Sequence, residues 1–301
     1  MIIKGYFHLC ADGRLTRRLI ICDTDYYATF NAIGIAAALS DFTVLAFSFE
    51  ESHPHVLGYG TYESCQRFKI LCEIIIFRHI VTSRGGADGV VFKLSIIPVD
   101  SESYLKTVGT YVISQPTKDG KIVMPYDYKW GTGSMYFRPA NHIPIWCFDS
   151  NGRYVEPFPI GQLSAREQAG ILHSKRRIPQ QDWTVCNGLL LPGNYVDVAH
   201  FERIYQTHNC FRAFMSSGKN KDMEVLNALA IANGIALEDK EAIEVCKVVC
   251  QEMFGENDTR RLTAKQRLAL AQQLKKDHML SKRQLATLVR LPEEEIFKYI
   301  K

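Results

Sequence analysis

The sequence lacks any apolar run of the roughly 20 residues that a helix needs to span a bilayer. Its first residues, MIIKGYFHLCADGR, contain too short an apolar stretch for a secretory signal peptide. The nine cysteines are an odd number and include no CxxC pair, which argues against both a disulfide framework and a zinc ribbon. We therefore expect a cytoplasmic protein with no membrane partner.

A strong positive charge is also missing. The formal net charge is +4, and residues 1–135 hold 13 lysines and arginines against 13 acidic residues. The excess lies in the rest of the chain, with 23 basic and 19 acidic residues. Because the first part is neutral overall, any contact that it makes with DNA must come from local patches rather than from a general field.

Apolar residues, in contrast, are plentiful enough for real cores, at 47% of 301 residues. The length predicts about two domains. In the first part we expect strands over residues 5–10, in the two apolar runs around residues 52–55, and over residues 89–98. Helices are expected from 24 to 40, capped by Asp23, and after Thr61. This β-α-β-β-α-β order predicts an α+β domain with the ferredoxin-like split βαβ topology, in which strands one and three are central.

A histidine pair lies between the second and third expected strands, in DFTVLAFSFEESHPHVLGYG. Strand side chains repeat every two residues, so an extended backbone places His53 and His55 on one face. Two imidazoles converging on one point usually begin a metal site, whereas Ser52 and Pro54 are equally typical of a plain hairpin turn. We expect His55 at a strand end, outside the core, where its replacement would leave the fold intact.

A tyrosine and a glutamine share one face of the next expected helix, which Ser101 can cap and which should end at Pro116. Tyr111 and Gln115 lie one turn apart. An amide oxygen is a suitable third ligand for a hard divalent ion held by two imidazoles, and a nearby tyrosine could act as a nucleophile. The plainer alternative is a partly buried helix tyrosine with a hydrogen-bonded hydroxyl.

The segment ESYLKTVGTYVISQPTKDGKIVMPYDYKWGTGSMYF resembles the nucleophile region of the REP-associated tyrosine transposases, which belong to the single-tyrosine HUH transposases. The shared pattern is a YxxxN/Q helix, then Pro, a Gly four residues later and a D-Y-x-W stretch. It falls on Tyr111, Gln115, Pro116, Gly120, Asp127, Tyr128 and Trp130. Upstream, SHPH resembles the family's His-x-His, and YFHLCADG with ICDTDYYATF resembles its first strand and helix. The resemblance covers residues 5–136.

The resemblance implies an HUH-type catalytic domain in which Tyr111 is the nucleophile and His53, His55 and Gln115 hold Mg²⁺ or Mn²⁺. It also implies cleavage and rejoining of single-stranded or hairpin DNA through a covalent 5′-phosphotyrosine, by a homodimer. Two departures keep an alternative open, namely a domesticated protein that binds DNA without cutting it. The stretch RHIVTSRGGADGVVFK has few cations, and Glu51-Ser52 stand where relatives commonly have Pro-Asn.

We divide the chain into an HUH-type domain over residues 1–136, a connector over 137–220 and a helical domain over 221–301. Two basic clusters are candidate DNA contacts, although solvated loops would explain them as well. They are Arg14, Arg17 and Arg18 in the first loop, and Lys175, Arg176 and Arg177 in the connector.

The last part of the chain has a helical pattern, with helices expected at about residues 239–254 and from Thr263 to about Asp277. SKRQLATLVRLPEEEIFKYIK then has the pattern of a helix-turn-helix that Ser281 would cap. Its expected packing residues are Leu285, Val289, Ile296 and Tyr299. Its second helix opens with three glutamates, which suit a helix N-terminus but repel phosphates. This helix could therefore read DNA in the major groove or contact a protein instead.

Overall fold

The computed structural model describes residues 3–11, 19–51, 53–86, 89–90, 92–118, 124–216, 239–278, 280 and 282–299. Contacts within the chain separate one unit over Met1–Val225 from a second over Leu226–Lys301. None of the described helices is long and apolar enough to cross a membrane.

Four strands form the main sheet of the first unit: β1 (Lys4–Ala11), β2 (Thr43–Phe49), β3 (Pro54–Thr61) and β4 (Leu94–Val99). Their order is β2-β3-β1-β4, and all neighbouring strands are antiparallel. This order matches the split βαβ prediction, with β1 and β3 in the middle. The mixed α+β class is therefore confirmed, although β4 begins later than the predicted residue 89.

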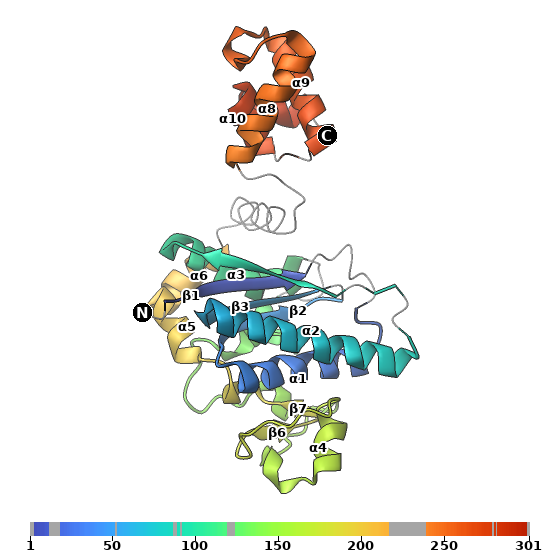
Figure 1. Cartoon of the computed structure of the whole chain (residues 1–301). Coiled ribbons are helices and arrows are strands. Elements are labelled where there is room, and N and C mark those ends of the chain that lie inside the picture. Colours follow the sequence, from blue (N-terminus) through green and yellow to red (C-terminus); the bar gives the residue numbers. More distant parts are fainter. Residues whose placement is uncertain are drawn as a thin grey trace. The chain divides into compact units, whose positions relative to one another are not determined.

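Helices cover both faces of this sheet. α1 (Asp23–Ser40) and α2 (Tyr62–Arg84) pack on one face, and α3 (Glu102–Lys118) packs on the other (Figure 1). Strand side chains alternate between the faces, so Leu9 of β1 joins the core beneath α1 and α2 while His8 faces α3. The sheet thus holds polar side chains on the α3 side without interrupting the main core.

The residues after α3 also belong to the first unit, including the segment predicted to be a connector. Trp146, Ile160 and Leu172 are buried in the same core as the sheet. A small second sheet has the strand order β5-β6-β7. The elements are η1 (Pro125–Asp127), η2 (Thr132–Met135), η3 (Ile145–Cys147), β5 (Phe158–Pro159), η4 (Ile160–Gln162), α4 (Ala165–Ile171), β6 (Thr184–Cys186), β7 (Leu189–Leu190), η5 (Pro192–Asn194), α5 (Val198–Tyr205) and α6 (His208–Ser216).

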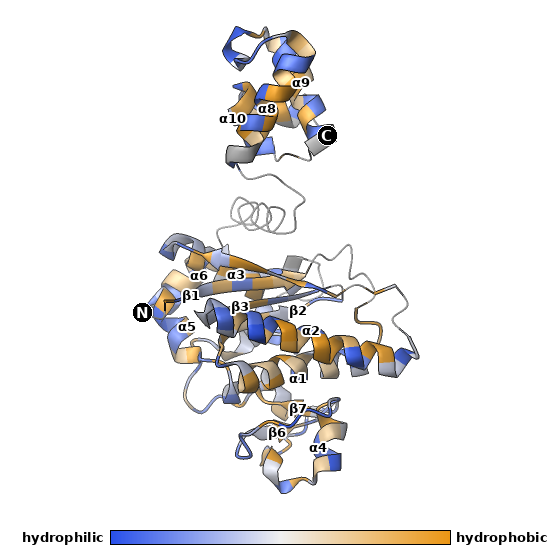
Figure 2. Ribbon diagram, in the orientation of Figure 1, coloured by the Kyte–Doolittle hydropathy of each residue, from blue (hydrophilic) through white to orange (hydrophobic). Residues whose placement is uncertain are grey.

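α1 joins the main sheet to this later segment. All of its residues from 28 to 36 are buried, and Figure 2 shows this helix as largely hydrophobic, as expected for a helix covered on several sides. Gly34 allows the close approach, because a Cβ there would lie 2.6 Å from Leu190 Cδ2. Asn31 reinforces it: its Nδ2 donates to the Gly188 carbonyl at 3.0 Å, and its Oδ1 accepts the Leu190 N–H at 2.8 Å.

The D-Y-x-W stretch covers the outer edge of β2. The Phe49 N–H donates to the Trp130 carbonyl at 2.9 Å, and the Tyr128 hydroxyl donates to the Phe49 carbonyl. The Trp130 ring stacks on Tyr26 at 4.7 Å, which ties this segment to α1. Because an open strand edge invites pairing with other chains, this stretch has a structural role in closing the sheet.

Two helix ends of the first unit differ from the prediction and two agree with it. Ser101 caps α3 as predicted, since its hydroxyl accepts the Tyr104 N–H at 3.1 Å. Asp23 does not cap α1 but is its first residue, with Cys22 at the cap position. α3 continues through Pro116 to Lys118, and in this last turn the hydroxyl of Thr117 donates to the Ser114 carbonyl at 2.6 Å. Thr61 caps α2 as predicted, since its side chain accepts the Ser64 N–H at 3.0 Å.

A buried ionic network fixes the start of α1 against the end of α2. Asp25 is 1% exposed, and its carboxylate lies 2.6 Å from Arg84 Nη2 and 2.8 Å from His79 Nε2. It also accepts the Ile21 N–H at 3.0 Å. Burial alone would raise the pKa of the Asp25 carboxyl, but these three donors outweigh burial and hold that pKa below its usual value.

We expect Asp25→Asn to lower the free energy of unfolding by about 3–5 kcal/mol at neutral pH, because it removes the charge opposite the Arg84 guanidinium. A lowered pKa means that this stabilisation is complete above the unfolded-state pKa and is lost as the pH falls through the folded-state pKa. Wild type and variant should therefore converge in acid. Urea unfolding at neutral and acid pH measures this.

The matched control is Glu102→Gln, which breaks the exposed pair with Lys106. Exposed pairs contribute little to stability, so its unfolding midpoint should stay at the wild-type value. A gap between Asp25→Asn and wild type that is equally wide at every pH would contradict the assigned role of the charge.

The second unit contains the helices expected from the sequence. They are α8 (Asp239–Phe254), η6 (Thr259–Arg261), α9 (Ala264–His278), α10 (Lys282–Val289) and α11 (Glu293–Tyr299). Gly255 follows α8 with a φ of 66°, as is usual for the residue after a helix. Thr263 and Gln266 bond reciprocally at the start of α9, where the Thr263 N–H donates to the Gln266 amide oxygen at 2.9 Å.

The predicted helix-turn-helix packing holds for three of its four apolar positions. Leu285, Val289 and Ile296 are fully buried. Tyr299 is not a packing residue, since it is 50% exposed at the last position of α11 and its ring lies 5.2 Å from Lys298 Nζ. Ser281, the expected cap, lies outside the described residues.

Candidate active site

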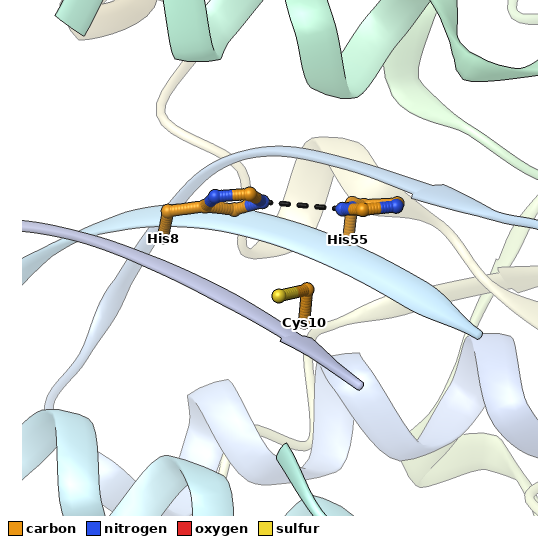
Figure 3. Close-up of side chains that lie close together, drawn as sticks. All are labelled: His8, Cys10 and His55. Carbon is orange, nitrogen blue, oxygen red and sulfur yellow. Dashed lines mark hydrogen bonds between the residues drawn. The ribbon is translucent and has the colours of Figure 1, made fainter. Parts of the chain in front are cut away.

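Three potential ligand residues meet on the α3 side of the two central strands (Figure 3). Cys10 of β1 pairs directly with His55 of β3, and His8 is two residues earlier on β1. All three are fully buried. The rings of His8 and His55 stack with centroids 5.4 Å apart, and His8 Nε2 lies 3.2 Å from His55 Nδ1. The burial of His55 corrects the expectation that this position lies outside the core.

The two imidazoles share one hydrogen bond, and its direction determines which nitrogens can bind a metal. Burial, and secondarily the nearby His53, lower the pKa of His8 to about 3. If His55 Nδ1 donates to His8 Nε2, then His55 Nε2 is unprotonated and can act as a ligand. If His8 Nε2 donates to His55 Nδ1 instead, the proton of the neutral His55 ring is on Nε2, and Nε2 cannot bind a metal. The partner of a liganding histidine therefore sets its tautomer.

His8, Cys10 and His55 can together hold a metal ion. One ring nitrogen of each histidine and the Cys10 Sγ all lie within 4.8 Å of one another. Two imidazoles and a thiolate suit zinc or a similar borderline-soft ion rather than Mg²⁺. This group shares His55 with the pair predicted from the sequence, but it approaches that ring from the β1 side.

His53 and His55 are brought together as the His-x-His spacing predicts. Their ring centroids are 4.6 Å apart in an edge-to-face arrangement. His53 precedes β3 and is partly exposed, and its Nδ1 lies 4.0 Å from a Glu50 carboxylate oxygen. The Glu50 N–H donates to the His53 carbonyl at 3.0 Å and closes the tight connection between β2 and β3. The turn and the histidine cluster are therefore parts of the same feature.

Tyr111 of α3 packs against this histidine cluster from above the sheet face on which the histidines lie. The Tyr111 ring centroid lies 5.4 Å from that of His55 and 6.1 Å from that of His8, edge-to-face in both cases. Tyr111 is 6% exposed. Gln115 is buried one turn further along α3, and its amide nitrogen donates to the Tyr111 carbonyl at 3.3 Å. Its amide oxygen is the atom that could coordinate a metal.

Of the two predicted basic clusters, the one in the connector lies within the described residues, and its arginines are not brought to this site. Arg14, Arg17 and Arg18 lie outside the described residues. Lys175, Arg176 and Arg177 follow α4. Arg176 lines a cleft with residues of α2, and Arg177 lines another with Leu39 of α1. Both helices lie on the face of the sheet away from α3, so Arg176 and Arg177 are on the other side of the sheet from Tyr111.

His8 and Cys10 are the site residues that the sequence analysis did not identify. Their signal was the alternation in the first strand, where Tyr6, His8 and Cys10 share one face. A buried strand with histidine at such a position needs a polar partner. Only the register of β1 with β3 shows that this partner is His55.

No family model matches the chain, and no curated protein matches it. Among solved structures, a REP-associated tyrosine transposase bound to a REP hairpin matches with a TM-score of 0.34 and 14% identity. The match covers 52% of this chain and 96% of that one. A TM-score this low does not establish a shared fold.

Proposed function

We propose that this chain cleaves and rejoins single-stranded or hairpin DNA in a transposase-like reaction, with Tyr111 as the nucleophile. The observation that carries the proposal is the position of Tyr111 on α3, with its ring 5.4 Å from His55 and beside the His53–His55 pair. The resemblance of residues 5–136 to tyrosine transposases supports the same assignment through the same residues.

The reaction exchanges one phosphate ester for another. The Tyr111 hydroxyl oxygen would attack the phosphorus of a phosphodiester, and the bond from phosphorus to the 3′-oxygen of the preceding nucleotide would break. The tyrosine loses its hydroxyl proton and the departing oxygen gains one, which leaves a 5′-phosphotyrosine and a free 3′-OH. Because the ester bond is conserved, a 3′-OH can reverse the step and rejoin the strand without another energy source.

His53, His55 and Gln115 are the residues that would hold a divalent ion here. His55 Nδ1 is turned to His8, so Nε2 would be its ligand atom. Gln115 would contribute its amide oxygen, since its nitrogen donates to the Tyr111 carbonyl. When bound, Mg²⁺ or Mn²⁺ would offset the charge that develops on the phosphate. His8 would keep His55 in the tautomer in which Nε2 carries no proton.

One observation favours a second function, namely DNA binding without cleavage. The part of the chain that contains Tyr111 has no net charge, with 13 basic and 13 acidic residues over positions 1–135. Proteins that process DNA usually rely on phosphate contacts for affinity. A transposase-derived binding protein would keep the fold and lose the reaction.

One experiment separates these functions. The full chain is incubated with a single-stranded DNA hairpin and Mn²⁺, and the products are resolved on a denaturing gel. A 5′-phosphotyrosine attaches the protein to the downstream fragment. A 3′-labelled strand should therefore give a labelled protein adduct, while a 5′-labelled strand should give a shorter, protein-free fragment that ends in a 3′-OH.

The adduct should disappear when EDTA replaces Mn²⁺. Retention of the label by the protein with the 5′-labelled strand would contradict the polarity of attack. Binding of the hairpin with no adduct from either strand, in Mn²⁺ or Mg²⁺, would favour the non-cleaving protein.

A further inference from the structure

A second concave surface lies at the C-terminal end of α3, where α3 meets residues 124–138 and α6. Its volume is about 450 Å³, within the range of about 300–1,000 Å³ that is typical of small-molecule sites. We name it the α3–α6 groove. The residues of its lining that matter here include Ser114, Thr117, Tyr126, Phe137, Arg138 and Arg212.

The charged groups of the groove suit an anion. Arg138, His208 and Arg212 are exposed at its surface, and its described lining includes no acidic side chain. The cleft at the other end of α3 is different, because Asp100 and Glu102 share it with Arg203. A phosphate would thus be attracted to the α3–α6 groove by two arginines that can each donate several hydrogen bonds.

The aromatic groups of the groove suit a flat ring. Tyr126 and Phe137 are half-buried at its wall, with the Arg138 guanidinium 4.8 Å from the Tyr126 ring centroid. The His208 ring stacks on Phe137 at 5.5 Å with an interplanar angle of 24°. Phe137 has a φ of 55°, an uncommon backbone for a bulky residue, and its N–H is held by the Glu202 carboxylate. These contacts hold both aromatic rings in place at the wall of the groove.

The groove lies beside the same helix that carries Tyr111, further toward its C-terminal end. Ser114 and Thr117 lie on α3 about 5 Å and 9 Å beyond Tyr111 along the helix axis, at 1.5 Å per residue. Both line the groove. A DNA strand held at Tyr111 could therefore place a neighbouring nucleotide in it.

We propose that the α3–α6 groove binds one nucleotide of single-stranded DNA, with its base against Tyr126 or Phe137 and its phosphate at Arg138 and Arg212. Cationic side chains along a path with interleaved aromatic rings are the usual means of holding single strands without reading their sequence. This inference rests on the proposed function, because it assigns the groove to the strand that Tyr111 would attack.

The test is fluorescence anisotropy of the full-length protein with a labelled, unstructured oligonucleotide. Arg212→Gln and Tyr126→Ala should each weaken binding by about tenfold, and Arg212→Gln should reduce the salt dependence by about one phosphate contact. Arg203→Gln, the same change in the other cleft, is the control and should bind as wild type does. Thermal unfolding of each variant establishes that it is folded, and Arg138→Gln provides a second charge variant.

The outcomes separate this inference from the proposed function. Wild-type affinity in folded Arg212→Gln, Arg138→Gln and Tyr126→Ala, together with an adduct in wild type, overturns the groove and leaves the reaction standing. Weakened binding in these variants without any adduct in wild type supports the groove and overturns the reaction. Equal competition by duplex and single-stranded DNA would overturn the nucleotide site, since a paired base cannot stack there.

Discussion

Tyr111→Phe should abolish the covalent DNA adduct and leave DNA binding at the wild-type level. The change removes only the hydroxyl and keeps the ring that packs against His55 and His8. At most about 1–2 kcal/mol of folding stability should be lost, the contribution of one buried hydrogen bond. The measurements are the denaturing gel with 3′-labelled DNA and Mn²⁺, and anisotropy with the same strand in EDTA.

Tyr104→Phe is the matched control. Tyr104 is a half-buried tyrosine on the same helix, seven residues before Tyr111 and about 10 Å away along the axis. It should form the adduct as wild type does. An adduct that survives in Tyr111→Phe and is lost in Tyr104→Phe would show that the nucleophile was assigned to the wrong tyrosine.

The sheet of the first unit could be predicted because its signals are local. Thr61 caps a helix, and Gly85 with a φ of 69° ends it, so α2 is bounded by two residues that need no distant partner. Alternation along the strands then gives the order of elements, and the topology follows from it. α3 passes through Pro116 to Lys118, whereas the rule that a proline ends a helix predicts an earlier end.

The packing of residues 137–216 could not be predicted because it depends on long-range contacts. Its strands are only two or three residues long and have no measurable period. These strands are held by α1. Gly34 has no side chain and allows Leu190 to approach closely, and the buried amide of Asn31 accepts the Leu190 N–H. The small residues of α1 indicate that another segment packs closely on this helix. They do not identify that segment.

The proximity of side chains could be predicted within a segment but not between segments. His53 and His55 are two residues apart, and Tyr111 and Gln115 are one helical turn apart, so period alone places each pair. His8 is 47 residues from His55 in the chain, and its hydrogen bond to that ring depends on strand register. The basic cluster around Arg176 shows the converse, because composition suggested DNA and the fold places it beside α2.

Substitution of His53 should have the second-largest effect on the reaction. His55 is fully buried, so its replacement would disturb the fold, whereas His53 is partly exposed before β3. We expect His53→Ala to raise the Mn²⁺ concentration for half-maximal adduct formation by more than about 100-fold, because it removes a ligand rather than a residue behind one. DNA binding in EDTA should not change.

His8→Ala should raise the same Mn²⁺ concentration less, by about 10–100-fold, because His8 orients His55 without touching the ion. Excess Mn²⁺ should restore the adduct in this variant.

Cys10→Ala distinguishes this arrangement from an ion held by His8, Cys10 and His55 together. If His8 only positions His55, Cys10→Ala should keep the wild-type Mn²⁺ dependence. Cys10→Ala could instead raise the Mn²⁺ concentration for half-maximal adduct formation as much as His8→Ala does, with an unchanged unfolding midpoint. That result would place the ion on the β1 side of His55 and would contradict the ligand set proposed here.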